Sequence, residues 1–353
     1  MSNNRIALTR LEEHIRAAIH INEVPFVAGS PGIGKSAMYQ AVADALNLKF
    51  LDFRLSMADF TDLVGLPHVS EGRAAFAPPK FFPLAGDPLP VKADGTDYAG
   101  WFISFEEINS APKSIQAIAY KILHDRMVGD YKLHPAVRLA ANGNLDSDRA
   151  VTESMSSALS SRMVQYETYI DPKEWLKWAT HPNCKVHFDP LVLMYLSFKE
   201  EHIHKFDPDS AEKSFACPRT WEKASKFMAL DPQFPLRYRA SIEGCISAAV
   251  TADVKAFIDY FAQVPKVDEI IRSPTTTELP STPGIRYATI LTVANAADTE
   301  ANFKAIFKYV ERFNPEYLLM FLRMHYRKHT TMWENPQSTI HEAVEPYFNV
   351  LFG

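Results

Sequence analysis

A glycine-rich loop between a predicted strand and a predicted helix constrains the fold more than any other feature of this sequence. The segment from Val24 to Leu46 reads VPFVAGSPGIGKSAMYQAVADAL. Its central GSPGIGKS matches the pattern G-x-x-x-x-G-K-[S/T] at every fixed position. An apolar strand before the loop and an amphipathic helix after it are the context in which such a loop binds phosphate.

Each fixed residue of this loop suits phosphate binding for a physical reason. Glycines let the backbone curl until successive N–H groups point at one anion, and the positive end of the helix dipole lies at the same place. Lys35 adds a full positive charge for the β- and γ-phosphates, and the Ser36 hydroxyl is a hard oxygen ligand for Mg²⁺. The predicted nucleotide-binding residues are Gly29, Ser30, Pro31, Gly32, Ile33, Gly34, Lys35 and Ser36.

The remainder of the first 170 residues alternates predicted strands with predicted helices. Besides the strand before the loop, strands are expected at 49–55, 101–108, 135–144 and 163–170. Helices are expected at 6–21, 111–126 and 151–161, and a hairpin at 127–133, where Gly-Asp interrupts apolar residues. This alternation predicts an α/β fold with a parallel five-stranded sheet.

After Asp171 the strand signals end and helical patterns dominate. Predicted helices cover 173–180, 190–202, 219–230, 239–261, 287–297, 300–313, 315–328 and 338–352. We therefore divide the chain into an α/β domain (1–170) with an insertion at about 56–90, a helical domain (171–265) and a helical C-terminal extension (266–353).

The composition favours a cytoplasmic protein. No apolar run reaches the ~18 residues that a membrane span needs, and the polar N-terminal stretch has no signal-peptide core. The 3 cysteines are far apart, which argues against a disulfide framework and for a reducing compartment. With 37 Lys and Arg against 42 Asp and Glu, the bulk charge does not favour nucleic-acid binding.

Two adjacent acids end the predicted strand WFISFEE. Carboxylates at a strand end beside a phosphate loop are the usual means of holding a metal ion and orienting water. We expect Glu106 to hold Mg²⁺ and Glu107 to polarise the attacking water. The first position is usually an aspartate, so the additional methylene of Glu106 puts its contact with the metal in doubt.

Several segments together resemble the AAA+ ATPases, and within them the MoxR-like branch. They are GSPGIGKS (29–36), DLVGLP (62–67), FISFEEINSAP (102–112), VGDYKL (128–133), AANGNLDSDRAV (140–151), SALSSRM (157–163) and CPRTWE (217–222). They fall between residues 24 and 225, about two-thirds of the chain. The resemblance implies a P-loop AAA+ core with a helix-2 insert at about 56–90, an all-helical lid and a helical C-terminal extension.

The resemblance also implies roles for individual residues. The family's GN dipeptide falls on Gly143-Asn144, which makes Asn144 the residue that bridges the γ-phosphate and the attacking water (sensor 1); Asn142 is the alternative. Arg162 matches the arginine finger, which reaches into a neighbouring subunit's site. Arg219 matches the lid arginine called sensor 2, and Pro218 before it suits a helix start.

What the resemblance implies about function is an ATP-dependent, Mg²⁺-dependent machine that remodels a protein partner. An arginine finger that acts in trans requires a homo-oligomer, and six subunits in a ring is the family's usual number. The implied partner carries a von Willebrand factor A domain. No membrane and no nucleic acid are expected among the partners.

Two alternatives stay open at this point. A nucleic-acid motor or loader would concentrate basic residues on the insertion, whose Arg73 and Lys80 are outnumbered by acids. Those acids are Asp59, Asp62, Glu71 and Asp87. A nucleotide-gated scaffold with weak hydrolysis is the other alternative, and Glu106 is the residue that motivates it.

Overall fold

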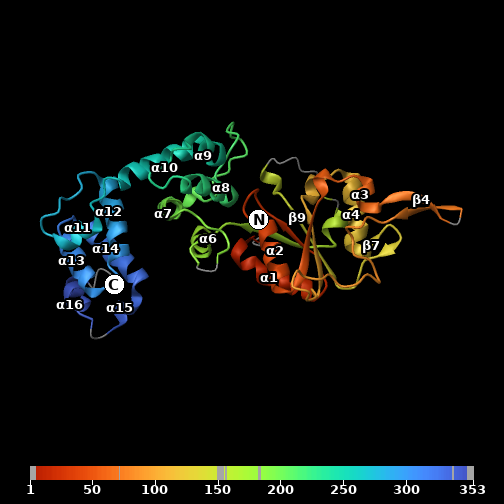
Figure 1. The fold of residues 1–353 in the computed structure, drawn as a ribbon, viewed down its shortest axis with the longest axis horizontal. Coiled ribbons are helices and arrows are strands. Elements are labelled where there is room, and N and C mark those ends of the chain that lie inside the picture. The colour runs from red at the N-terminus through yellow and green to blue at the C-terminus, as the bar shows by residue number, and fades with distance from the viewer. Residues whose placement is uncertain are drawn as a thin grey trace. The chain divides into compact units, whose positions relative to one another are not determined.

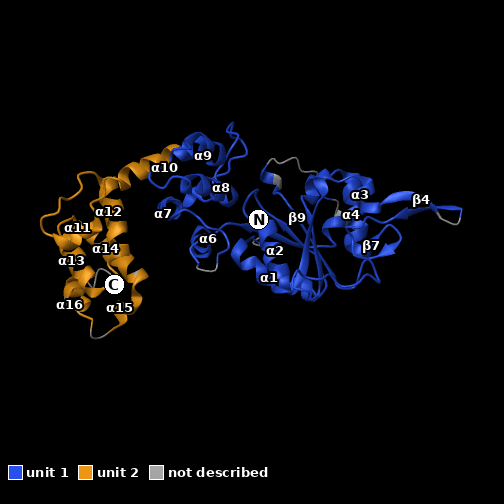
Figure 2. Ribbon diagram, viewed as in Figure 1, with its two compact units in different colours: residues 1–251 blue, residues 252–353 orange. Residues whose placement is uncertain are grey.

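The computed structural model describes residues 5–70, 72–148, 155, 157–181, 184–335 and 338–347. Two compact units, Met1–Thr251 and Ala252–Gly353, make up the chain (Figure 2). The domain divisions expected at residues 170 and 265 stay predictions.

The first unit contains one parallel sheet of six strands in the order β1-β10-β2-β9-β6-β3. The strands are β1 (Arg5–Ala7), β10 (Val164–Tyr169), β2 (Pro25–Ala28), β9 (Val137–Gly143), β6 (Gly100–Glu106) and β3 (Leu48–Arg54). All five neighbouring pairs are parallel, so the predicted α/β fold is confirmed.

The predicted number of five strands was wrong, because β1 adds a sixth at one edge of the sheet. We expected a helix from residue 6, but Ile6 pairs with Thr168 of β10 and α1 (Leu8–His20) begins afterwards. A strand of three residues is too short to show a periodicity of two, and its pairing partner lies far away in sequence.

Helices cover both faces of the sheet. On one face, Val27, Phe102 and Ala140 pack under α1 and α2 (Lys35–Ala45). On the other, the residues next in sequence, among them Ile103, pack against α4 (Lys113–Asp125). This alternation explains why the strands read as continuous apolar runs, as strands buried on both faces do.

Between β3 and β6 the insertion forms its own small elements. A short helix, α3 (Phe60–Val64), leads into an antiparallel ribbon of β4 (Leu66–Ser70) and β5 (Arg73–Ala77). Figure 1 shows this ribbon projecting from the sheet-bearing part of the first unit. The hairpin predicted at 127–133 is confirmed, with β7 (Met127–Val128) paired to β8 (Tyr131–Lys132).

The rest of the first unit is helical, as predicted. Its helices are α5 (Ser157–Ser160), α6 (Pro172–Ala179), α7 (Pro190–Phe198), α8 (Pro218–Ala229), α9 (Arg239–Ile246) and α10 (Ala248–Phe261), the last of which continues into the second unit. The single helix expected over 239–261 was wrong, because Ser247 adopts a left-handed φ of 78° and separates α9 from α10. Residues 151–154 and 156 of the expected 151–161 helix lie outside the described residues.

Among the described residues of the second unit, all secondary-structure elements are helices, joined by loops. Its helices are α11 (Val267–Arg272), α12 (Pro283–Ala296), α13 (Glu300–Val310), α14 (Pro315–Lys328), α15 (Thr330–Glu334) and α16 (Ile340–Val344). Phe303, Tyr309 and Phe321 are fully buried in its core. Across both units, none of the described helices combines the length and the apolar character needed to span a membrane.

The second unit contains a buried histidine, His325, with a hydrogen-bond partner at each ring nitrogen. The Trp333 Nε1–H donates to His325 Nδ1 (2.8 Å), so the other ring nitrogen carries the proton and donates to the Ala297 carbonyl (2.8 Å). Both ring nitrogens are therefore satisfied in the neutral form. Burial lowers the pKa of His325 from 6.5 to about 4, and the Ala297 carbonyl opposes this shift.

We expect the second unit to lose stability as the pH falls from 6.5 to about 4, because in that window the unfolded chain binds the additional proton. The loss is at most about 3–4 kcal/mol, at about 1.4 kcal/mol per pKa unit. Urea unfolding followed by tryptophan fluorescence checks this. His325→Phe should flatten the pH dependence, whereas the same substitution at the exposed His124 should not; an unchanged slope in His325→Phe contradicts the assignment.

Candidate functional site

The phosphate loop joins β2 to α2 and presents unpartnered backbone donors. Within the described part of the chain, the N–H groups of Gly32 through Ser36 have no hydrogen-bond acceptor. Gly32 adopts a positive φ of 76°, and a Cβ there would come within 2.4 Å of the Cys217 sulfur. The loop therefore keeps an anion-binding set of N–H groups at the start of α2, and only glycine fits where α8 approaches it.

Lys35 folds back onto the loop that carries it. Its Nζ donates to the carbonyl oxygens of Gly29 (2.5 Å) and Ser30 (3.1 Å) and lies 3.5 Å from Asn144 Oδ1. Burial lowers its pKa from 10.5 to about 8, opposed by the charges of Glu106 and Asp148. A polyanion in the loop would replace these carbonyl contacts with a full opposite charge.

Nucleotide affinity should therefore fall at alkaline pH. Above a pKa of about 8 the free protein holds Lys35 neutral, so binding a triphosphate requires uptake of a proton. We expect the Kd to rise by up to about tenfold per pH unit above that value. Titrations with a fluorescent nucleotide at a series of pH values check this, with Lys35→Arg as the control because its guanidinium stays charged. A flat wild-type profile would contradict the assignment.

Ser36 and Glu106 bring two hard oxygens together. The Ser36 hydroxyl donates to Glu106 Oε2 at 2.5 Å, and Glu106 is 4% exposed at the end of β6. An oxygen-only pair of a hydroxyl and a carboxylate beside a phosphate site is the donor set that Mg²⁺ prefers. The additional methylene of Glu106 therefore does not move its carboxylate away from Ser36.

Glu107 lies at the same strand end but faces other partners. Its backbone is left-handed, with φ of 58°. The Ser56 hydroxyl donates to Glu107 Oε2 (2.5 Å), and the Arg54 guanidinium lies 3.7 Å from Oε1. Both partners come from the end of β3 and the residues after it, a contact that sequence reasoning missed because neither residue belongs to a motif.

The structure gives the two candidate asparagines, Asn142 of β9 and Asn144 just after it, different surroundings. The side chain of Asn144 lies at Lys35, whereas Asn142 is 1% exposed and its Oδ1 accepts from the Glu107 backbone N–H (3.3 Å). Asn109 holds Asn144 in place: its Nδ2 donates to the Asn144 carbonyl (2.7 Å), and its Oδ1 accepts from the Asn144 N–H (3.1 Å). Gly143 permits this, because a Cβ there would lie 2.3 Å from Asn109 Oδ1.

The first turn of α8 lies against the phosphate loop. The Arg219 N–H donates to the Gly32 carbonyl (3.3 Å), and Pro218 begins the helix as predicted. The charge of Arg219 lowers the pKa of Lys35, so the two cations lie within electrostatic range of each other. Arg219 and Lys35 are thus brought to one site.

Arg162 is directed elsewhere. It is exposed just after α5, and its guanidinium lies over the Tyr120 ring of α4 at 5.6 Å from the centroid. Among the described residues, no hydrogen bond or ion pair joins it to the phosphate loop. Its position leaves the guanidinium accessible from outside the subunit.

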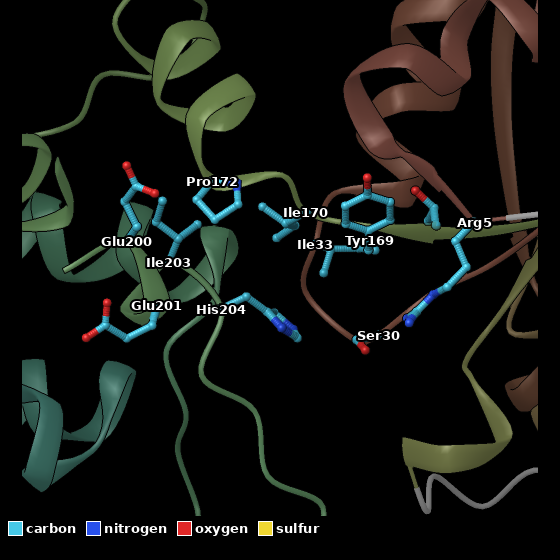
Figure 3. A pocket seen from close by; sticks show the side chains of 11 residues that line it. Arg5, Ser30, Ile33, Tyr169, Ile170, Pro172, Glu200, Glu201, Ile203 and His204 are labelled. Atoms are coloured by element: carbon cyan, nitrogen blue, oxygen red, sulfur yellow. The ribbon is translucent and has the colours of Figure 1, made fainter. Parts of the chain in front are cut away.

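Next to the loop is a pocket of about 200 Å³ (Figure 3). It is lined by Arg5, Ser30, Ile33, Thr168, Tyr169, Ile170, Pro172, Glu200, Glu201, Ile203 and His204. In Figure 3 the His204 side chain points into the pocket, in the direction of Ser30. Burial lowers the pKa of His204, and the Pro31 backbone opposes this shift. Sequence reasoning missed this pocket because its residues are scattered over several elements and carry no motif.

Comparison with known proteins finds one family profile that matches part of the chain. Residues 25–164 match the family profile of the AAA domain (dynein-related subfamily). No curated protein matches the chain. The matched segment contains the phosphate loop, both acids and both candidate asparagines.

The chain is also similar to solved structures. A candidate ATPase from Cytophaga hutchinsonii ATCC 33406 is 13% identical, with 92% of this chain and 81% of that chain covered and a TM-score of 0.35. A point mutant of RuvB from Thermotoga maritima is 14% identical, with 88% and 85% covered and a TM-score of 0.37.

Proposed function

We propose that this chain, whose residues 25–164 are an AAA domain of the dynein-related subfamily, hydrolyses ATP with Mg²⁺ and uses the energy to remodel a protein partner. The observation that carries the proposal is the set of side chains gathered around Lys35. Glu106, Glu107 and Arg219 all contribute to its electrostatic environment, and Asn144 lies 3.5 Å from its Nζ. Phosphoryl transfer needs this combination of positive charge, a metal-holding acid and a water-orienting group.

Each residue has a distinct role in the proposed reaction. The loop N–H groups and Lys35 bind the phosphates, and Ser36 with Glu106 would hold Mg²⁺, which neutralises charge that develops on the phosphate oxygens. Glu107 orients the attacking water once its carboxylate leaves Ser56. Asn144 serves as sensor 1, and Arg219 of the lid approaches the phosphates.

The pocket beside the loop would receive the nucleoside part of ATP. Ser30 and Ile33 line it from the phosphate loop, so a ligand there is continuous with one in the loop. Ile170, Pro172 and Ile203 supply apolar surface to the pocket, which suits the faces of a purine.

The proposed catalytic unit is a homo-oligomeric ring of six subunits, the number that the resemblance to the MoxR-like AAA+ proteins implies. The supporting observation is the exposed Arg162, which has no contact with its own phosphate loop and is free to enter a neighbour's site. A head-to-tail contact that closes gives such a ring. We propose a protein with a von Willebrand factor A domain as the partner, on the basis of the sequence resemblance.

The experiment that tests the proposal compares phosphate release by wild type and Glu107→Gln, together with a pull-down of each in the presence of ATP. The variant should retain nucleotide but turn over about 10²–10⁴-fold more slowly, because it lacks the water-polarising carboxylate. It should therefore retain a partner that wild type releases. Wild-type protein that releases no phosphate, with or without captured partners, would contradict the proposed hydrolysis.

A nucleotide-gated scaffold is the second candidate, and the contacts of Glu107 favour it. Ser56 and Arg54 engage the carboxylate that would have to orient water. The scaffold predicts ATP-dependent assembly with almost no turnover and a large gain in Glu106→Asp. A high rate of ATP hydrolysis by the wild-type protein would rule out the scaffold.

A further inference from the structure

Glu106 is held from two sides by hydroxyl groups. Its Oε2 accepts from Ser36 (2.5 Å), and its Oε1 accepts from Ser104 (2.6 Å). Ser36 belongs to α2, whereas Ser104 lies two residues before Glu106 on β6, so both strand residues point to the same face of the sheet. One carboxylate thus links the phosphate loop to the interior of the sheet.

Ser104 is an unusual residue for its position. It is 0% exposed, and the same face of β6 carries Phe102, which packs in the apolar core under α1 and α2. Among the described residues, the only hydrogen bond of the Ser104 side chain goes to Glu106. A buried hydroxyl is costly without a partner, so its presence in this core is explained by the carboxylate.

We propose that Ser104 is a positioning residue that allows a glutamate to serve where this site usually has an aspartate; this rests on the function proposed above. A glutamate side chain has one more rotatable bond than an aspartate, and its carboxylate would otherwise sample several positions. The bond from Ser104 fixes Oε1, which leaves Oε2 beside Ser36. Because Ser36 then donates its proton to Glu106, its oxygen lone pairs remain available for a metal ion.

The proposal predicts that the effects of substituting Ser104 and Glu106 on metal binding are coupled. With Glu106 present, loss of the Ser104 hydroxyl frees the carboxylate and weakens the metal site. With aspartate at 106 the carboxylate lies one methylene closer to the strand and does not span the distance to both hydroxyls, so Ser104 loses its effect. A double-mutant cycle separates this coupling from a general effect on folding.

The experiment measures Mn²⁺ binding to the ADP-bound full-length chain by electron paramagnetic resonance. The proteins compared are wild type, Ser104→Ala, Glu106→Asp and the double variant, with thermal melting of each. Ser104→Ala should raise the Mn²⁺ Kd by about tenfold, within the range known for outer-shell partners of metal ligands. In the Glu106→Asp background the same change should alter the Kd by less than about twofold, the size expected for uncoupled sites.

Ser225→Ala is the matched control, because Ser225 is buried in α8 and bonds to the Asp189 backbone away from this site. It should leave Mn²⁺ binding unchanged. Equal effects of Ser104→Ala in both backgrounds, or none with Glu106 present, would overturn the role of Ser104 alone. Wild-type protein that binds ADP but no Mn²⁺ would instead overturn the proposed metal site, and with it this inference.

Discussion

Lys35→Ala should abolish measurable nucleotide binding. The ammonium is partly buried against the loop, within electrostatic range of Glu106 and Asp148, and it is the positive charge that the loop itself supplies for the phosphates. Removing one partner of a buried charge pair costs about 2–5 kcal/mol, which corresponds to a rise in Kd of about 30-fold to 5,000-fold. Isothermal titration or fluorescent-nucleotide binding measures this directly.

The matched control for this experiment is Lys226→Ala. Lys226 lies on α8 and makes an exposed ion pair with Glu222 one helical turn away (2.6 Å). Such pairs contribute little, so binding should stay within a factor of about two. Unchanged nucleotide binding in Lys35→Ala would refute the phosphate-loop assignment, since no other residue of the loop has a positively charged side chain.

Arg162→Ala should leave nucleotide binding by the monomer almost intact and reduce turnover by about 10³–10⁵-fold, the range known for arginine fingers. The reason is geometric: Arg162 is exposed and makes no contact with its own loop, so its loss does not disturb binding within the subunit. A planar guanidinium pairs with two phosphate oxygens at once, which favours the transition state.

Arg162→Lys provides the matched comparison for the alanine variant. It keeps the positive charge but loses the planar fork, so its rate should lie between those of wild type and Arg162→Ala. Phosphate release at saturating ATP measures all three. Full activity of Arg162→Ala, with the oligomer intact, would show that the finger is another residue.

The parts of the candidate site that can be predicted from the sequence are those formed by consecutive residues. The loop around Lys35 occupies eight consecutive residues, and Glu106 and Glu107 follow an apolar strand directly. In these two segments, the sequence pattern alone predicts which backbone or side-chain groups face a bound nucleotide. The order of strands then brings the ends of β2, β6 and β9 together, as a parallel sheet must.

The parts that the sequence did not reveal depend on pairings between distant segments. Strand β1 exists because Ile6 meets Thr168, and the contact of Ser56 with Glu107 joins residues 51 positions apart. The Ser104 hydroxyl is visible in the sequence only as one polar residue in an apolar strand. Its role becomes apparent only in the structure, where it donates a hydrogen bond to the Glu106 carboxylate.

The break at Ser247 illustrates a different limit. The segment 239–261 keeps helical spacing of apolar residues on both sides of Ser247, so periodicity alone predicts one helix. One left-handed residue interrupts the helix without changing that spacing. Helix existence was therefore predictable here, whereas helix continuity was not.

The most direct test of the central claim, a phosphate site completed by a neighbour's arginine, is to mix Arg162→Ala with Glu107→Gln subunits and measure phosphate release. Each variant alone should be nearly inactive. In mixed assemblies, some interfaces combine an intact Glu107 with an intact Arg162 from the adjacent subunit, so activity should reappear and reach a maximum at intermediate ratios. Mixed oligomers that form but never regain activity would contradict the account.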